Sequence, residues 1–354
     1  MENYLKEIQS TNISDFLTAD FFAKLSSFSP STREEYLAHM QLVYNLKLNT
    51  KFPLVVHVET TNSCNQKCIM CQHPSMTRKK QNISPELAYK AIDESIKEKA
   101  WFLHFFFFGE PFLNKKTLEY MKYARDKGME NISLTTNFTT ISENEIEKLV
   151  DYEINSVHIS FEGLNRDLYK KIRKTDHYDK VISNIQTLIE YKKKKNSLKP
   201  WIALTYVRTI ETDEEINQFK NTWGDLVNDI HISPQFDYLG RAEIIEYQEA
   251  VNSEGILNRD IESRQACRQL WLRMVVLSNG DLVPCSQNMD GELSVGNIKD
   301  ISIAEAWNNH EMNDLRIQHL ANQYKDDCIC KNCIDWDWSG KIDDRPKLDR
   351  KKIL

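Results

Sequence analysis

Cysteine is absent from the long middle of this 354-residue chain. No cysteine lies between Cys71 and Cys267. The first three cysteines end at Cys71, and the other five begin at Cys267. The first residues, MENYLKEIQS, lack the charged and then apolar pattern of an export signal, so we expect a cytoplasmic protein with reduced thiols. Eight reduced cysteines in two groups are typical of metal ligands rather than of disulfides.

Long apolar runs and an excess of positive charge are missing as well. The longest apolar run, 101–108, is interrupted by His104 and is too short to span a membrane. The net charge of −6 argues against a nucleic-acid-binding surface. We therefore expect neither a membrane nor a nucleic acid as partner, and a hydrophobic content of 41% is enough for a large core.

Short runs rich in β-branched and aromatic residues alternate with helical patterns in the first two thirds of the chain. The predicted strands are 53–60, 101–108, 131–136, 156–161, 201–207 and 229–234. Ser84-Pro85 and a capping box at Ser142 mark two of the helix starts between them. The alternation predicts an α/β fold with parallel strands and right-handed crossovers. Six such units favour a partial (β/α) barrel, with a doubly wound sheet as the alternative; in both folds ligands gather at the C-terminal ends of the strands.

Three domains follow from this pattern. Residues 1–50 are predicted to form a helical cap, 51–240 the partial barrel and 241–354 a small C-terminal module. In that module, 271–285 is typical of a β-hairpin that turns at Asn279-Gly280. The module carries its own cysteines.

The first cysteine group has the spacing Cys64-x3-Cys68-x2-Cys71, directly after the first predicted strand. Three thiolates are one fewer than a closed tetrahedral site needs. One interpretation is a structural zinc site with His57 or His73 as the fourth ligand. The other is a [4Fe–4S] cluster held by three thiolates, which leaves one iron open to another ligand.

This spacing, together with the motifs that end the next strands, resembles the radical S-adenosylmethionine (SAM) superfamily. The family's CxxxCxxC hallmark is matched by the three cysteines. Its GGEP, TN and SxDG segments are similar to Phe108-Gly109-Glu110-Pro111, Thr135-Thr136-Asn137 and Ser160-Phe161-Glu162-Gly163. The chain departs from these segments at Phe108 and Glu162, where the family has Gly and Asp.

The resemblance implies that SAM binds the open iron and is cleaved reductively to a 5′-deoxyadenosyl radical, which abstracts hydrogen from a substrate C–H bond. It also implies a set of SAM contacts: Met70, Gly109, Glu110, Pro111, Thr136, Asn137, Ser160, Glu162 and Arg173. Several of these contacts have an alternative. Met70 can pack in the core, and Glu110 can be a structural side chain. The polar residues at the strand ends, Thr136, Asn137, Ser160 and Glu162, can cap strand-to-helix turns.

The second cysteine group resembles the C-terminal SPASM and twitch domains of the same superfamily, which hold auxiliary iron–sulfur clusters. Five cysteines suit the single cluster of the twitch form, and the layout is similar to that of the butirosin-pathway aminocyclitol dehydrogenase. The resemblance assigns an auxiliary [4Fe–4S] cluster to Cys267, Cys285, Cys330 and Cys333. A zinc ribbon is the alternative. Cys328 has no place in this assignment, and three interpretations of it stay open. It could be the cluster ligand in place of Cys330, a thiol that donates hydrogen to a substrate radical, or an inert residue.

A fully ligated auxiliary cluster has no place for substrate, so its expected role is electron transfer. We therefore expect a radical SAM oxidoreductase that dehydrogenates a small polar substrate such as a sugar or aminocyclitol. Three alternatives stay open: a radical epimerase, a peptide- or protein-modifying SPASM maturase, and a zinc-stabilised binding protein without catalysis. An electron donor such as flavodoxin or ferredoxin is the expected protein partner. Asp237, Tyr238 and Arg241, after the sixth strand, are candidate substrate contacts, although a surface turn also explains Arg241.

Overall fold

The computed structural model describes three stretches of the chain. These are 49–208, 215–234 and 264–333, together with the single residues 35, 39, 40, 43, 241 and 336. The predicted helical cap, 1–50, lies almost entirely outside the described residues, as do Asp237 and Tyr238.

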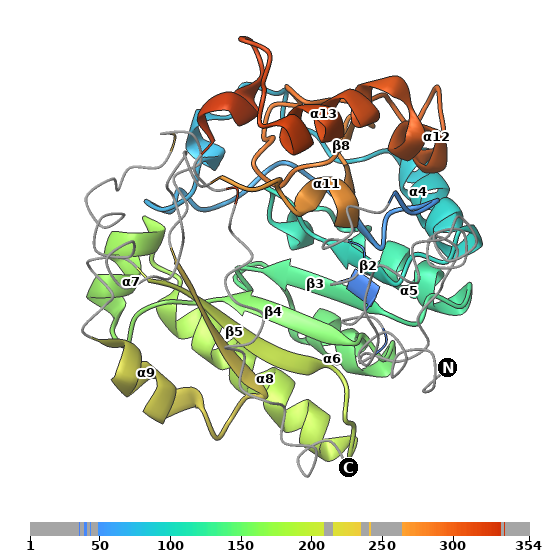
Figure 1. The fold of residues 1–354 in the computed structure, drawn as a ribbon. Helices are drawn as coiled ribbons and strands as arrows, with labels where there is room; N and C mark the ends of the chain where they lie inside the picture. Colours follow the sequence, from blue (N-terminus) through green and yellow to red (C-terminus); the bar gives the residue numbers. More distant parts are fainter. Residues whose placement is uncertain are drawn as a thin grey trace, which may run out of the picture.

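An eight-stranded sheet with the order β6–β5–β4–β3–β2–β1–β7–β8 forms the centre of the described chain (Figure 1). The strands are β1 (Val55–Val58), β2 (Phe102–Phe105), β3 (Ile132–Thr136), β4 (Ser156–Ser160), β5 (Trp201–Arg208), β6 (Asp229–Pro234), β7 (Arg273–Val276) and β8 (Leu282–Val283). All neighbouring pairs are parallel except β7 and β8. The six predicted strands are confirmed, and because β6 and β8 end the order without pairing to each other, the sheet is that of a partial barrel.

Helices fill the crossovers between the parallel strands. They are α4 (Pro85–Lys97), α5 (Thr117–Asp126), α6 (Glu143–Asp151), α7 (Arg166–Arg173), α8 (Tyr178–Lys194) and α9 (Ile216–Trp223). The predicted helix starts are confirmed: Ser84 caps α4 by accepting from the Leu87 N–H, and Ser142 forms a capping box with Glu145. No helix of the described stretches is long and apolar enough to cross a membrane.

Side chains alternate between two faces of the sheet. On the outer face, Leu103, Phe105, Leu134 and Ile159 are fully buried in one apolar core with residues of the crossover helices. The intervening residues, such as His104, point to the inner face because successive side chains of a strand alternate. Sheets of parallel strands are usually buried and apolar on both faces, so a polar inner face marks a place for a ligand.

The C-terminal segment continues the main sheet. β7 pairs in parallel with β1, with Val55 opposite Arg273 and His57 opposite Val275. The predicted hairpin is confirmed with its turn at Gly280 (φ +93°), but it begins at Arg273, because Trp271 and Leu272 belong to α11 (Gln269–Leu272). The sequence pattern did not predict that this hairpin would extend the sheet, and the boundary at residue 240 stays a prediction.

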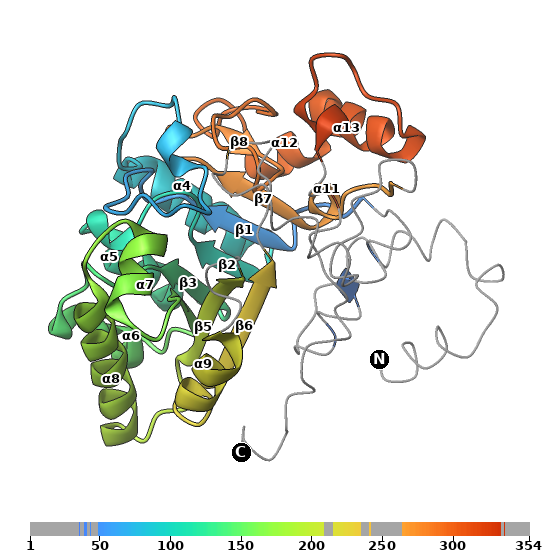
Figure 2. The same cartoon turned by 90° about the vertical axis from the view of Figure 1, so that its left-hand side faces the viewer.

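Two more helices complete the C-terminal segment. α12 (Ile303–Asn308) and α13 (His310–Ala321) lie beside β7 and β8 in both views, away from α7, α8 and α9 (Figure 2). The Trp307 indole donates to the Thr50 carbonyl at 2.9 Å, and the Arg316 guanidinium donates to the Leu270 carbonyl at 3.0 Å. These bonds hold the segment against the beginning of β1 and against α11. The described residues also include the short 3₁₀ turns η2 (His73–Ser75), η3 (Pro111–Leu113) and η5 (Ile329–Asn332).

Candidate active site

The loop with the first three cysteines follows β1, at the C-terminal edge of the sheet. Cys64, Cys68 and Cys71 are half-buried and form no disulfide. Burial raises the pKa of Cys64 and of Cys71 to about 12, and the three sulfurs are close enough for their charges to interact. Thiols of this kind stay protonated at neutral pH unless a metal replaces the proton, so the loop fits a cationic group that binds thiolates. No three His, Cys, Asp or Glu side chains of the described residues converge closely enough to hold a single metal ion.

The ends of the next two strands hold this loop in place. The Glu110 N–H donates to the Ser63 carbonyl at 2.8 Å. The Glu110 carboxylate accepts from the Thr136 hydroxyl at 2.6 Å and from the Asn137 N–H at 2.7 Å. Asn137 in turn donates through Nδ2 to Asn65 Oδ1 at 2.8 Å. Three predicted site residues thus form one network with the cysteine loop, and burial raises the pKa of Glu110 to about 7.

Gly109 packs against the backbone of the same loop. A Cβ at this position would lie 2.0 Å from the Thr61 carbonyl oxygen and 2.9 Å from that of Ser63. A glycine among the SAM contacts that the resemblance implies would let the backbone approach that ligand. The structure gives a second reason, since only glycine lets the end of β2 lie this close to the cysteine loop.

Arg173 joins the far side of the loop to the end of β4. Its Nη1 lies 3.5 Å from Cys68 Sγ, and its guanidinium forms an ion pair with Glu162. Glu162 is fully buried and also accepts from the Val207 N–H at 3.1 Å. Burial raises the pKa of Glu162, and the charge of Arg173 opposes that shift. The two residues lie where the resemblance places them, but they pair with each other within the protein.

The remaining predicted SAM contacts lie around the same loop. Met70 is buried in a small apolar cluster with Ile69 and Ile172, which matches the core-packing alternative. Pro111 is buried in the first turn of η3, and Ser160 is half-buried at the end of β4. Their contacts with SAM stay predictions.

A row of imidazoles crosses the inner face of the sheet below the cysteine loop. The rings of His57 and His104 stack with centroids 4.9 Å apart, and His158 lies 6.0 Å from His104. His104 Nε2 and Thr135 Oγ1 are 3.0 Å apart. Burial and the charge of Arg273 hold the pKa of His57 well below its usual range, so this ring is neutral. His104 therefore has the partners of a satisfied core histidine.

The possible zinc ligands are engaged elsewhere. His73 Nε2 lies 2.9 Å from the Asn62 carbonyl oxygen, within hydrogen-bonding distance, and His57 belongs to the imidazole row. Neither ring is directed at the three cysteines by these contacts.

The second cysteine group is assembled from three separate segments. Cys267, Cys285 and Cys330 are buried, and Cys333 is half-buried. Burial raises the pKa of Cys285, and the neighbouring Cys267 and Cys333 raise it further. Cys330 also lies close enough to Cys285 and Cys267 for their charges to interact. The four cysteines assigned to the auxiliary cluster are thus brought together.

Cys328 lies beside this group. A hydrogen bond with Cys330 lowers the pKa of Cys328, which is half-buried. Around the group, the Cys267 N–H donates to His319 Nδ1 at 3.2 Å, and Arg264 donates to the Cys330 carbonyl at 2.6 Å. These two bonds fix the backbone at Cys267 and at Cys330, two of the four cysteines assigned to the auxiliary cluster.

A buried ion pair connects the two cysteine regions, and the sequence analysis missed it. Arg78 donates to both carboxylate oxygens of Glu59 at 2.8 Å, and its Nε donates to the Met289 carbonyl at 2.5 Å. The backbone N–H groups of Thr77 and Arg78 donate to Asp290 Oδ1 at 2.9 and 3.1 Å. Opposite charges on either side of the cysteine loop were the only sequence signal for this clamp, which we call the Arg78–Glu59 clamp.

Two buried amides lie next to the two cysteine groups. Gln72 directly follows Cys71, and Asn288 follows Cys285 by three residues. Both side chains are fully buried, and neither amide has a hydrogen-bond partner within the described part of the chain. Buried polar groups are normally paired, so these amides fit a site that a bound cofactor or substrate completes.

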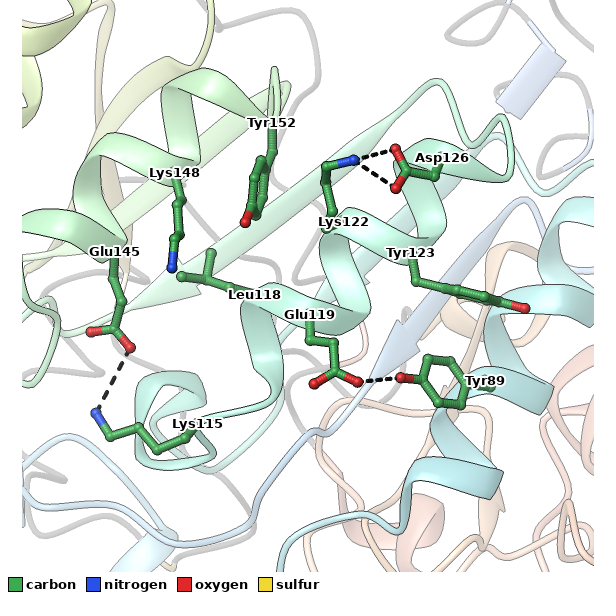
Figure 3. A pocket seen from close by; sticks show the side chains of 10 residues that line it. All are labelled: Tyr89, Lys115, Leu118, Glu119, Lys122, Tyr123, Asp126, Glu145, Lys148 and Tyr152. Carbon is green, nitrogen blue, oxygen red and sulfur yellow. Dashed lines mark hydrogen bonds and ion pairs between the residues drawn. The ribbon is translucent and has the colours of Figure 1, made fainter.

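Arg241 is paired within the protein, and a surface depression lies on the outer helices. Arg241, a candidate substrate contact, forms an ion pair with Glu292 at 2.7 Å. A depression of about 410 Å³ lies between α4, α5 and α6, lined by Tyr89, Lys122 and Glu145 among others (Figure 3). Its charges pair with one another, as in Lys122 with Asp126, and it lies on the outer helices rather than at the strand ends.

Two family models match the chain. The Radical SAM superfamily model matches residues 58–222, which contain the three-cysteine loop and the motifs that end β2, β3 and β4. The SPASM model, an iron–sulfur cluster-binding domain, matches residues 267–334, which contain all five later cysteines. The chain thus carries both domains, and with them the [4Fe–4S] clusters and SAM as cofactors.

Curated relatives share part of this sequence. A probable GTP 3′,8-cyclase of Methanocaldococcus jannaschii is 34% identical over 143 residues, which are 38% of this chain and 45% of the relative. A probable GTP 3′,8-cyclase of Sulfurisphaera tokodaii is 28% identical over 201 residues, 54% of this chain and 62% of the relative. The chain thus spans about half the length of the curated relatives it matches.

Solved structures share the fold. SuiB of Streptococcus suis, bound to the precursor peptide SuiA, has a TM-score of 0.61 at 15% identity and covers 88% of this chain and 78% of its own. BtrN in complex with AdoMet and 2-DOIA has a TM-score of 0.54 at 17% identity, and the match covers 79% of this chain and 92% of BtrN. The structure of anSMEcpe with bound AdoMet has a TM-score of 0.56 at 19% identity, and the match covers 81% of this chain and 84% of anSMEcpe.

Proposed function

Because the chain carries a radical SAM domain and an SPASM domain, we propose that it oxidises a small polar substrate by a radical mechanism. When bound, SAM and the cluster at Cys64, Cys68 and Cys71 supply a 5′-deoxyadenosyl radical that takes hydrogen from a substrate C–H bond. Loss of one further electron and one proton completes a two-electron oxidation. The protein's part is to hold the cofactors and the substrate in place and to exclude water.

The observation that carries the oxidation is the difference between the two cysteine groups. Three thiols in the first group leave one iron of a cubane open to SAM. The second group offers four thiols that lie close enough for their charges to interact, and a cluster bound by all four would have no free position for substrate. A cluster closed in this way can accept the electron that the substrate radical loses.

The inner face of the sheet supports a polar substrate. His158, Ser160 and Thr205 belong to strands whose other face is buried, yet each is only half-buried. Imidazole and hydroxyl groups can both donate and accept hydrogen bonds, which suits hydroxyl and amino groups of a substrate. The aromatic residues on the same face of β2, such as Phe102, can pack on the apolar faces of a sugar ring.

The test is an anaerobic turnover experiment. The reconstituted protein is given SAM and dithionite, with sugars, aminocyclitols, short peptides and GTP as separate candidate substrates. The proposal predicts deoxyadenosine together with an equal amount of a product that has lost two hydrogen atoms. Failure to form deoxyadenosine with any substrate would refute the radical mechanism, and a product of unchanged mass would support epimerisation.

A second candidate is a cyclase that acts on a nucleotide. Several relatives are named probable GTP 3′,8-cyclase, and the M. jannaschii relative is 34% identical over its matched part. Since the chain spans about half their length, the activity in their names is proposed for this chain only as a candidate to be tested. Consumption of GTP in the same experiment, with no oxidation of the other candidates, would favour the cyclase.

A further inference from the structure

An exposed basic surface lies beside the three-cysteine loop. It consists of Lys67, Lys170, Lys171 and Lys174, and we call it the basic ridge. All four side chains are exposed. Lys67 lies in the loop between Cys64 and Cys68, whereas the other three lie on the solvent face or at the end of α7. Two elements that are more than one hundred residues apart thus contribute to one surface.

Three contacts bring the loop and α7 together. Gln66 Nε2 donates to the Tyr169 hydroxyl at 2.9 Å, and the Ile69 N–H donates to the Ile172 carbonyl at 3.0 Å. Between them, Cys68 Sγ lies 3.5 Å from the Arg173 guanidinium. Residues on both sides of Lys67 are therefore fixed to α7, and the half-buried Cys68 lies at the edge of the ridge.

The charges of the ridge are largely unneutralised. Within the described residues, Lys67, Lys171 and Lys174 have no ion-pair partner, and Lys170 pairs with Asp176 at 3.5 Å. Cations in the last turn of a helix complement its dipole, which accounts for Lys170 and Lys171. This reason does not apply to Lys67, which is in a loop. The ridge also contrasts with the chain as a whole, whose net charge is −6.

We propose that the basic ridge docks an acidic one-electron carrier protein of the flavodoxin class. The proposal rests on the function proposed above, because the electron that cleaves SAM must enter at the three-cysteine loop. A positive patch steers a negative partner to this surface, where the exposed Lys67 lies next to the half-buried Cys68. Electron-transfer encounters use small and polar interfaces, which four lysines on two adjoining elements can provide.

The chain offers a matched control for a charge-reversal test. Lys193 and Lys194 are exposed in the last turn of α8, which leads into the start of β5 at Trp201. That end of the helix lies at the N-terminal edge of the sheet, opposite the cysteine loop. The variants K67E/K171E and K193E/K194E therefore change the net charge by the same amount at opposite edges.

The first measurement is binding of oxidised flavodoxin to the holoprotein by titration calorimetry at low salt. We expect the Kd to rise about tenfold or more in K67E/K171E and to change by less than about twofold in K193E/K194E. A rise in salt concentration should weaken binding to the wild-type chain and to the control variant alike, because exposed charges are screened. If K67E/K171E and K193E/K194E bind flavodoxin with the same Kd, or if the wild-type chain does not bind flavodoxin, the proposal is wrong.

The second measurement separates docking from the proposed function. Cleavage of SAM is followed with reduced flavodoxin and, separately, with dithionite as the reductant. We expect K67E/K171E to lose flavodoxin-driven cleavage and to keep dithionite-driven cleavage. If the wild-type chain fails with dithionite, the proposed function fails rather than the docking surface. If dithionite-driven cleavage also falls in K67E/K171E, the milder K67Q/K171Q decides: weaker flavodoxin binding supports the proposal and unchanged binding refutes it.

Discussion

The two cysteine regions are built in opposite ways. The first three cysteines lie within eight residues of one loop, half-buried at the end of β1. The four assigned to the auxiliary cluster come from three segments separated along the chain, and three of them are buried. A local loop with three thiols leaves room for a ligand that enters and leaves. A buried site with four thiols from distant segments holds its occupant permanently, so the two sites are suited to chemistry and to electron transfer respectively.

The fold nevertheless makes one unit of the two regions. β7, which precedes Cys285, pairs directly with β1, which precedes Cys64. The Arg78–Glu59 clamp then joins the segment after Cys71 to the segment after Cys285. The distance between the two clusters is therefore set by strand pairing and by a buried ion pair.

The largest effect should come from removing one thiol from each region in turn. Cys64→Ser should lower SAM cleavage at least ~100-fold, because even the loss of a residue that supports a ligand costs that much in some metal sites. Cys285→Ser should keep SAM cleavage but abolish oxidised product. Deoxyadenosine and product are measured by chromatography and mass spectrometry. If Cys285→Ser stops SAM cleavage while Cys64→Ser does not, the assigned roles are reversed.

The next effect concerns the Arg78–Glu59 clamp. Arg78→Met leaves the carboxylate of Glu59 buried without its partner, which should lower the free energy of unfolding by ~3–5 kcal/mol. The control is Lys122→Met in the exposed pair with Asp126, which should cost less than ~1 kcal/mol. Urea unfolding of the holoprotein measures both. Equal stability of the two variants would show that the clamp does not hold the regions together.

A smaller effect should appear in the pH dependence of stability. Burial raises the pKa of Glu110 to about 7 in the folded chain, so its contribution is fully present below its ordinary pKa and is lost as the pH rises through about 7. Between pH 5 and 8 the wild-type chain should lose about 2 kcal/mol that Glu110→Gln does not lose. Urea unfolding at several pH values measures the difference, and parallel curves for the two proteins would contradict the buried, protonatable carboxyl.

The smallest effect is expected at Cys328. Cys328→Ala should leave iron content, SAM cleavage and product unchanged, because Cys267, Cys285, Cys330 and Cys333 already supply four thiols. Cys330→Ala is the matched variant and should lose the iron of one cluster. Normal SAM cleavage without product in Cys328→Ala would instead make Cys328 a hydrogen donor, and loss of iron would make it a ligand.

The sequence predicted the local features of this protein well. Each of the six predicted strands is present, and the capping box at Ser142 begins α6, because alternation and capping are properties of a few neighbouring residues. The three-cysteine loop and the strand-end motifs were likewise readable as short patterns. Glu110, Thr136 and Asn137 were identified as site residues, although their mutual hydrogen bonds were not foreseen.

The features that the sequence did not reveal depend on contacts between distant segments. The pairing of β7 with β1 joins residues more than two hundred positions apart, and a hairpin pattern does not say which strand it extends. The Arg78–Glu59 clamp and the basic ridge arise only when separate segments meet in the fold. The imidazole row comes from three strands whose register no single pattern encodes.

Electron paramagnetic resonance can show whether one cluster is open to SAM while the other is closed. The reduced holoprotein, Cys64→Ser and Cys285→Ser are each measured with and without SAM. We predict two cluster signals in the wild-type chain, of which SAM changes only the one that Cys64→Ser lacks. The signal that Cys285→Ser lacks should be the same with and without SAM. A change of that second signal on addition of SAM, or no change of either signal, would contradict the account.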